Sequence, residues 1–313
     1  MKNDKYVVYI YNVCNVLMHE KMKPFILLLT LACIVSCGSN RRTSSFLSHI
    51  DTLYQQNPAE AIHSIDSFMS CHNDMSQHNR MLLTLYRLRA QNSVGEPFAS
   101  DSLARKVVEY FDDNGSVEEQ MSAYYVLGSV YRDLDNYPEA LADYQKAVTL
   151  ADTTDGNKNN AFLNRVYGQM GNVLLSQLAF NEAGVAYSMA VRFACKDKDT
   201  LGVLLSKEQI ANVLYLQNRR DEACKLREWL HDEYLKNGFV REASKVLVPN
   251  VSTLLGRGKV EEVGRILRSY EEHSGDVDSL GNVVSGLEKY YNDKANYLLA
   301  KSDVSGALGY YRK

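Results

Sequence analysis

Apolar and small side chains recur at helical spacing in pairs of segments along most of the chain. The clearest pair covers about residues 121–151, and a second copy follows in register at about 161–195. Small residues stand where the two helices of a pair would meet, at Gly128 and Ala140 in the first copy and at Gly171 and Ala183 in the second. Large residues, mostly Tyr and Leu, stand where successive pairs would stack. Because one pair cannot bury its apolar face alone, the pattern predicts an all-α fold, an α-solenoid of stacked helix-turn-helix hairpins.

Weaker copies extend this pattern over residues 46–313, with two hairpins before the clearest one and three after its second copy. The small residue of the first helix, called helix A of each hairpin, recurs at spacings of 43, 40, 40 and 44 residues, at Gly128, Gly171, Ala211, Val251 and Ala295. Pro249 falls inside helix A of the sixth hairpin, and we expect it to kink that helix. The run 255–259 lacks the following Ser or Thr and the upstream strand of a phosphate loop, so it is interpreted as the turn of that hairpin.

The 121–151 copy is similar to a tetratricopeptide repeat (TPR), although the standard repeat has about 34 residues. The block Ala123–Leu134, the opening Asn57–Ala61 and the helix start Asp101–Leu103 resemble TPR lipoproteins and membrane-bound regulators of Gram-negative bacteria. This resemblance implies a non-enzymatic scaffold that binds a protein or peptide partner. Longer members continue into a transmembrane helix and a cytoplasmic output, so the alternative is the sensory, periplasmic half of a truncated transcriptional or signalling regulator.

The last predicted hairpin reaches the end of the given sequence. Tyr311 takes the register of Tyr144, so the counterpart of Ala147 would be the residue after Lys313. A solenoid end normally carries a capping helix with a polar outer face. We therefore expect the repeat domain to be incomplete at its C-terminus.

The N-terminal part carries an export signal. After Met22 and Lys23 comes an apolar run of eleven residues, 25–35, well short of the roughly 20 residues that cross a bilayer as a helix. The sequence Ile34-Val35-Ser36-Cys37 resembles a bacterial lipobox, which implies cleavage before Cys37 and lipidation of its thiol. An ordinary signal peptide with an incidental cysteine is the alternative.

These features divide the chain into four parts. They are a stretch that precedes the expected start codon (1–21), a lipoprotein signal peptide (22–36), a tether (37–45) and the TPR-like helical repeat domain (46–313). The implied location is the bacterial cell envelope, with the protein anchored to the membrane by lipid, facing the periplasm, and with the outer membrane favoured.

The composition and motifs argue against several other functions. A formal charge of −3 gives no basic surface for nucleic acid. Cys71-His72 with His78 matches no common zinc spacing, so we expect a polar turn and no metal site. Nucleophile-elbow and zinc-protease motifs do not occur, so we expect no catalytic residue and no cofactor. An enzyme or carbohydrate-binding subunit of an outer-membrane uptake system is the least supported alternative, because the predicted loops are short.

Two columns of helix A residues form the candidate peptide-binding groove, because A helices line the concave side of a TPR superhelix. The first column holds short amides and hydroxyls that can hydrogen-bond an extended peptide backbone, at Ser129, Asn172, Asn212, Ser252 and Asn296. The second column would favour carboxylates or acidic segments, at Arg165, Lys245 and Lys289. The alternative is that these polar residues are simply tolerated at a solvated position. Gly168 and Glu208 stand where a clamp for a carboxyl-terminal tail would need lysine, so that clamp is not supported.

Overall fold

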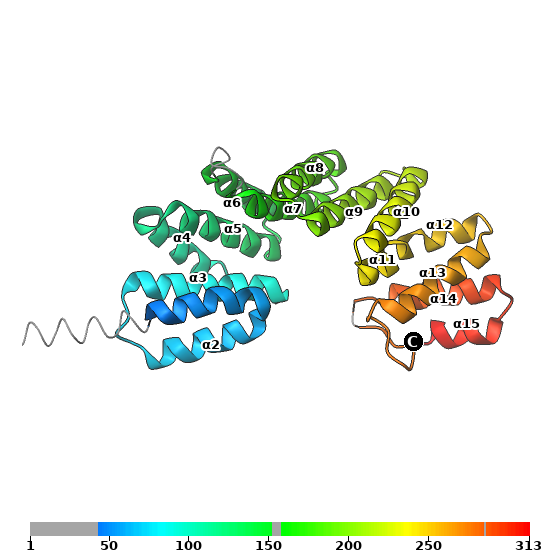
Figure 1. Cartoon of the computed structure of the whole chain (residues 1–313), viewed down its shortest axis with the longest axis horizontal. Coiled ribbons are helices and arrows are strands. Elements are labelled where there is room, and N and C mark those ends of the chain that lie inside the picture. The colour runs from blue at the N-terminus through cyan, green and yellow to red at the C-terminus, as the bar shows by residue number, and fades with distance from the viewer. Residues whose placement is uncertain (1–42, 152–157, 285) are drawn as a thin grey trace, which may run out of the picture. The chain divides into compact units, whose positions relative to one another are not determined.

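A computed structural model describes residues 43–151, 158–284 and 286–313, and these residues are helical with one isolated β-bridge between Val277 and Val283. The order of the elements can be followed in Figure 1. The chain divides into two compact units, residues 1–136 and 137–313. The predicted all-α hairpin architecture is confirmed, and each unit is described by itself. Lipidation at Cys37, the upstream stretch and the signal peptide fall outside the described residues.

The first described element of the N-terminal unit is a helix over residues 43–56, which overlaps the end of the predicted tether. The helices that follow are α2 (Pro58–Cys71), α3 (Gln77–Val94), α4 (Ser102–Asn114) and α5 (Val117–Asp133). Asn57 caps α2 by accepting the backbone N–H of Glu60 at 3.2 Å, and Pro58 takes the first turn, where no amide hydrogen is needed. The main core lies between α3, α4 and α5 and includes Leu85, Phe111 and Val130.

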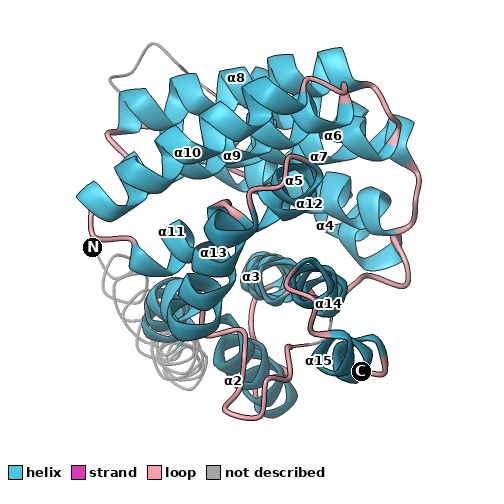
Figure 2. Ribbon diagram, turned by 90° about the vertical axis from the view of Figure 1, so that its right-hand side faces the viewer, coloured by secondary structure: helices cyan, strands magenta, loops and turns pink. Residues whose placement is uncertain are grey.

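The C-terminal unit contains the remaining hairpins, and their predicted positions are confirmed. Its elements are α6 (Tyr137–Leu150), α7 (Asn160–Ser176), α8 (Phe180–Asp197), α9 (Thr200–Leu216), α10 (Arg220–Lys236), α11 (Val240–Val246), α12 (Val251–Gly256), α13 (Val260–His273), α14 (Lys289–Ala300) and α15 (Val304–Tyr311). Neighbours in the sequence pack against one another, as α8, α9 and α10 do in Figure 2. Helices α7, α9, α11 with α12, and α14 are the A helices of this unit. The B helices are α6, α8, α10, α13 and α15.

Pro249 breaks helix A of the sixth hairpin, as predicted. Helix α11 ends at Val246, a 3₁₀ turn (η1) covers Val248–Asn250, and α12 starts at Val251. The ring of Pro249 cannot donate the next helical hydrogen bond, so the chain tightens there and then resumes. The run 255–259 covers the last two residues of α12 and the turn to α13, as its interpretation as the turn of this hairpin predicts.

Close contacts between helices explain the small residues. A methyl group added to Gly171 on α7 would lie 2.5 Å from Cε1 of Tyr187 on α8, so only glycine allows this approach. Ala183 and Ala211 are fully buried in the same unit, and so is Ala140. The predicted role of the small column is therefore confirmed for the α7–α8 hairpin.

A left-handed residue recurs in the turn of each of these hairpins. It stands seven residues after the small residue of helix A, at Asp135, Leu178, Asn218, Gly258 and Ser302. The φ angles are 56°, 59°, 62°, 73° and 63°, respectively. This conformation costs an L-residue roughly 1–2 kcal/mol, yet only one of the five positions is glycine. The helix-turn-helix geometry therefore imposes the conformation in spite of the residue type.

Candidate functional site

The first predicted column lies on the A helices, as expected. In the C-terminal unit Asn172 is on α7, Asn212 on α9, Ser252 on α12 and Asn296 on α14. Asn212 is half-buried and the other three are exposed. Ser129 belongs to α5 of the N-terminal unit, where it is buried and its hydroxyl donates to the backbone oxygen of Tyr125 at 3.0 Å.

Each asparagine of this column accepts a hydrogen bond from helix B of its own hairpin. The donor stands fifteen residues further along the chain in all three cases. The bonds are Tyr187 Oη to Asn172 Oδ1 at 2.7 Å, Arg227 Nη2 to Asn212 Oδ1 at 2.9 Å, and Tyr311 Oη to Asn296 Oδ1 at 2.7 Å. Burial raises the pKa of Tyr187 to about 12, so its hydroxyl keeps its proton at neutral pH. The column therefore ties helix A to helix B, and its amide oxygens are already engaged.

Arg227 differs from the tyrosines because it reaches two A helices. Its Nη1 donates to Asn250 Oδ1 at 3.0 Å while Nη2 holds Asn212, so one guanidinium links the fifth and sixth hairpins. The side chain is only 2% exposed, and among the described residues no carboxylate lies within ion-pair distance. Burial lowers its pKa from the ordinary value. The Tyr215 ring, 5.5 Å from the guanidinium carbon, and the two amide oxygens stabilise the charge.

The guanidinium fixes the direction of a short hydrogen-bond relay. It has only donors, so the Asn212 atom that faces it must be the oxygen, and the other atom is the amide nitrogen. That nitrogen donates to Gln209 Oε1 at 3.1 Å. The side-chain amide nitrogen of Gln209, Nε2, has no hydrogen-bond partner among the described residues. A buried positive charge is therefore connected, through two amides, to an N–H donor on the partly exposed face of α9.

Glu208 lies next to this relay on α9. Tyr234 donates to its carboxylate at 3.1 Å, and burial is the main reason that the pKa of Glu208 is raised. Burial likewise raises the pKa of Tyr234. Glu208 is therefore a half-buried acceptor beside the relay, and Tyr234 already donates to it.

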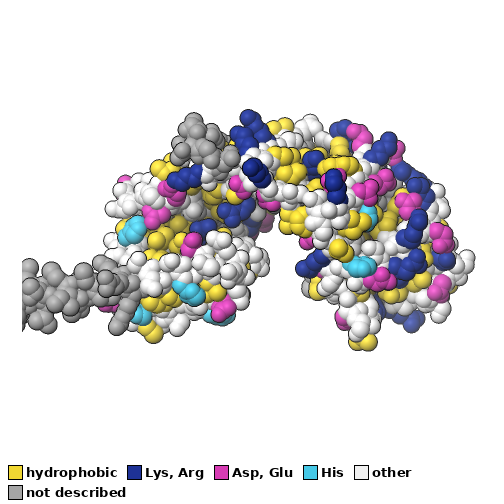
Figure 3. Space-filling model, viewed as in Figure 1, with side chains coloured by type: hydrophobic (Ala, Val, Ile, Leu, Met, Phe, Trp, Pro, Cys, Tyr) yellow, Lys and Arg dark blue, Asp and Glu magenta, His cyan; other side chains and the backbone are white. Residues whose placement is uncertain are grey.

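The second predicted column is largely paired with carboxylates. Lys245 on α11 binds Asp276 at 2.7 Å, and Lys289 on α14 binds Asp293 at 2.6 Å. Arg165 on α7 is exposed and has no ion-pair partner among the described residues. Basic and acidic side chains are also interspersed over the C-terminal unit on the face shown in Figure 3. A continuous positive edge is therefore not formed by these three residues.

Ser252 borders an open cleft of about 570 Å³ between α12 and the turn that joins α9 to α10. Two ion pairs lie along it, Arg219 with Glu222 and Arg257 with Asp221. Arg220 also borders the cleft, and its guanidinium carbon lies 5.6 Å from the centre of the Tyr215 ring. The cleft is therefore polar, and Arg220 is the arginine of its described lining that forms no ion pair.

The comparison with protein families concerns the α5–α6 segment. Residues 122–153 match the model of the tetratricopeptide repeat. The chain contains a TPR. A comparison with curated protein sequences found no match.

Solved structures share the TPR-like solenoid fold at low sequence identity. Aspartyl phosphate phosphatase F from Bacillus subtilis is 15% identical, with 100% of this chain and 83% of that chain covered and a TM-score of 0.55. The apo quorum sensor NprR from B. thuringiensis is 13% identical, with 86% and 85% covered and a TM-score of 0.53. The Rap conjugation gene regulator of plasmid pLS20, in complex with the Phr* peptide, is 14% identical, with 84% and 72% covered and a TM-score of 0.50. At these identities the likeness shows the fold alone.

Arg227 and Gln209 are the site residues that the TPR pattern did not single out. The sequence does mark Arg227, because a charged residue there takes the repeat position that Tyr187 and Tyr311 hold in other hairpins. Within the described ranges, no group of three His, Cys, Asp or Glu residues could hold a metal ion. In the same part of the chain, no helix combines the length and the apolar character that a membrane span requires.

Proposed function

We propose that this chain is a lipid-anchored, non-enzymatic TPR scaffold of the periplasm that binds a peptide or protein segment along its A helices. The relay from Arg227 through Asn212 to Gln209 is the observation that carries the proposal. It uses two half-buried amides and a buried charge to present an N–H donor on the A-helix face. An ordinary repeat contact would not need a charged residue at that register.

The ligand that suits this face is an acceptor-rich one. The asparagine oxygens of the column are occupied by helix B, so the groups left for a ligand are amide hydrogens. Amide hydrogens bind backbone carbonyls of an extended segment, or a side-chain carboxylate. One solved structure of similar fold holds a peptide, the Rap regulator with Phr*, and this supports a peptide ligand by analogy of fold.

Site-specific photocrosslinking from the A-helix face tests the groove. A benzophenone amino acid replaces Gln169 on α7, which leaves the relay through Gln209 intact. Lys225, which is exposed on helix B of the fifth hairpin, is the matched control. We expect covalent adducts with a partner from position 169 and none from 225. Equal adducts from 225, or none from 169, would refute binding along this face.

A second variant tests whether the relay itself, and not only the A-helix face around it, contacts the ligand. Gln209→Glu replaces the outward N–H donor by an acceptor of the same size and leaves the acceptor that faces Asn212 in place. With the probe at position 169, we expect this change to reduce the adduct by about tenfold, since a donor–acceptor pair becomes a repulsive contact between acceptors. An unchanged adduct yield would show that the relay does not contact the ligand.

The lipid anchor is a separate part of the proposal and rests on the lipobox that ends at Cys37. Metabolic labelling with a fatty acid should mark the wild-type chain and not Cys37→Ala. The control is Cys33→Ala, which leaves the lipobox cysteine in place and should still be labelled. Label that persists on Cys37→Ala would exclude this residue as the anchor.

The sensory half of a membrane-bound regulator is the second candidate function. Two of the structures with similar folds are described as a quorum sensor and as a conjugation gene regulator, which favours a role in signalling. The DNA downstream of codon 313 distinguishes the two. An in-frame continuation that encodes an apolar run of about 20 residues would support the regulator, and an immediate stop codon would support the separate scaffold.

A further inference from the structure

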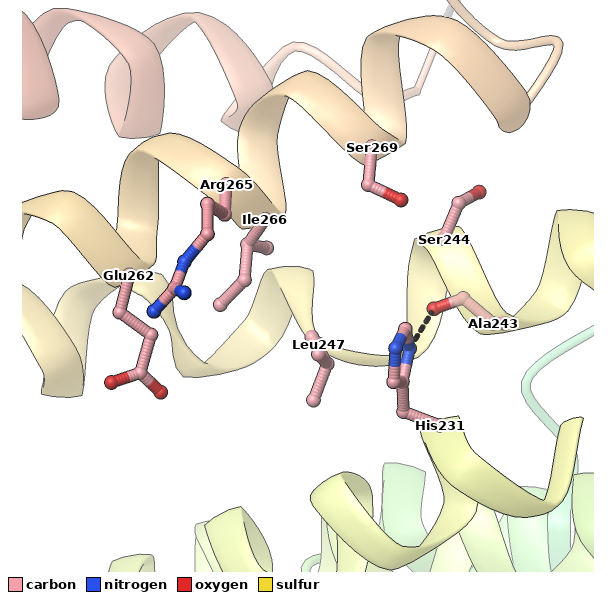
Figure 4. Close-up of a pocket in the computed structure, with 8 residues that line it drawn as sticks. All are labelled: His231, Ala243, Ser244, Leu247, Glu262, Arg265, Ile266 and Ser269. Atoms are coloured by element: carbon pink, nitrogen blue, oxygen red, sulfur yellow. Dashed lines mark hydrogen bonds between the residues drawn. The ribbon is translucent and has the colours of Figure 1, made fainter. Parts of the chain in front are cut away.

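A cavity of about 280 Å³ lies between α10, α11 and α13 of the C-terminal unit. It is formed mainly by the B helices of the fifth and sixth hairpins, so it does not involve the predicted column on the A helices. Figure 4 shows its lining, with Leu247 and Ile266 in the middle, Glu262 and Arg265 at one end, and Ser244 and Ser269 at the other. The cavity therefore combines an apolar floor with polar ends.

The polar end on α13 has an unmatched positive charge. Arg265 is exposed, and its guanidinium has no hydrogen-bond or ion-pair partner among the described residues. Glu262 also lies at this end, but it is already paired with Lys259 at 3.1 Å. The guanidinium is thus the group that is available to a ligand, and its planar fork matches a carboxylate.

A histidine on α10 is held in a fixed orientation at the same cavity. His231 Nδ1 lies 2.9 Å from the backbone oxygen of Ala243, as the dashed line in Figure 4 shows. A carbonyl oxygen only accepts, so Nδ1 carries the hydrogen and Nε2 has no partner among the described residues. The ring therefore presents a free polar atom beside the apolar floor.

The size of the cavity limits what can occupy it. Pockets for drug-sized ligands usually measure about 300–1,000 Å³, so this one suits a single residue. An internal acidic motif would need two residues to supply both an apolar side chain and a carboxylate. A C-terminal residue supplies both groups by itself.

We propose that this cavity binds the C-terminal residue of a peptide or protein, with an apolar side chain on Leu247 and Ile266 and the terminal carboxylate on Arg265. This second site does not depend on the groove along the A helices, and Gln209 plays no part in it.

Short labelled peptides test the site on the full chain by fluorescence anisotropy. The probe is Gly-Gly-Ser-Phe with a fluorophore on its N-terminus, compared as the free acid and as the C-terminal amide. We expect the free acid to bind and the amide to bind at least tenfold more weakly, because hydrogen bonds to a charged group are the stronger ones. Arg265→Gln should weaken the free acid by a similar factor.

Matched controls test whether Arg265 itself holds the carboxylate. Arg268→Gln removes an exposed arginine one turn further along α13 that does not line the cavity, and it should leave affinity unchanged. Gln209→Glu should also have no effect, which separates this test from that of the groove. Equal affinity for acid and amide, or equal losses from Arg265→Gln and Arg268→Gln, would overturn the proposal. Competition by free phenylalanine as effective as by the peptide would also overturn it, in favour of an amino-acid site.

Discussion

A methyl group added at Gly171 should be less favourable for stability than the same group added at Gly168. Both glycines lie inside α7, one turn apart, so replacement by alanine gains about 1 kcal/mol of helix propensity in each case. At Gly168 a new Cβ would meet nothing within 4 Å. At Gly171 it would lie 2.5, 2.7 and 2.8 Å from three ring carbons of Tyr187.

The ring of Tyr187 cannot easily move away from that methyl group. The side chain is 1% exposed, and its hydroxyl is held by Asn172 at 2.7 Å. Overpacking of this kind costs about 1–3 kcal/mol. We therefore expect Gly168→Ala to be stabilising by about 1 kcal/mol, and Gly171→Ala to be about 1–3 kcal/mol less stable than Gly168→Ala.

Urea unfolding, followed by far-ultraviolet circular dichroism, measures this difference as a shift in midpoint at constant slope. In a Tyr187→Ala background the penalty at Gly171 should disappear, because the methyl group then has room. The reasoning is refuted if Gly171→Ala is as stable as Gly168→Ala in the wild-type background. It is also refuted if the penalty survives the loss of the ring.

Three further predictions concern the polar contacts. Arg227→Lys should destabilise the C-terminal unit by about 1–3 kcal/mol in urea unfolding, because one ammonium cannot reproduce the fork that holds Asn212 and Asn250; stability equal to wild type would contradict it. Burial raises the pKa of Asp276, but Arg241 and Lys245 on α11 lower it further, so the folded pKa lies below the ordinary value. The stability that Asp276→Asn removes should therefore be present above the unfolded pKa of about 3.9 and be lost as pH falls through the lower folded pKa. A stability difference between wild type and variant that persists at the acid end would contradict this sign. Tyr187→Phe should cost about 0.5–1.5 kcal/mol in the same assay, through the loss of one hydrogen bond, and no change would mean that the bond adds nothing.

The helical repeats could be predicted from the sequence because they follow local rules. Periodic small residues such as Gly171 report a helix contact within one hairpin, and Pro249 must disturb a helix wherever it stands. These signals depend on neighbours within about 20 residues in the chain. The presence of the hairpins and the interruption at Pro249 were therefore predicted correctly, while several helix ends lie a few residues from their predicted positions.

The site could be predicted only in part, because its contacts depend on how side chains far apart in the sequence meet. Lys245 is paired with Asp276, which lies 31 residues further along the chain, and no helical periodicity reveals that pairing. Arg227 reaches Asn250 across 23 residues in the same way. The column of Asn residues was placed on the correct helices, but its engagement by helix B depends on side-chain geometry. Its role in binding a ligand stays a prediction.

The left-handed turn residue gives the hairpins a common turn geometry. The seven-residue interval from the small residue to Leu178, Asn218 or Ser302 is constant, and so is the fifteen-residue interval from each column asparagine to its donor. The varying repeat length must therefore arise between hairpins and not within them. Each hairpin can then be treated as an exchangeable cassette. We consider a chimera in which residues 165–190 replace 205–230. It should keep the left-handed turn and the hydrogen bond between helix A and helix B. It exchanges Arg227 for a tyrosine and so removes the link to the sixth hairpin.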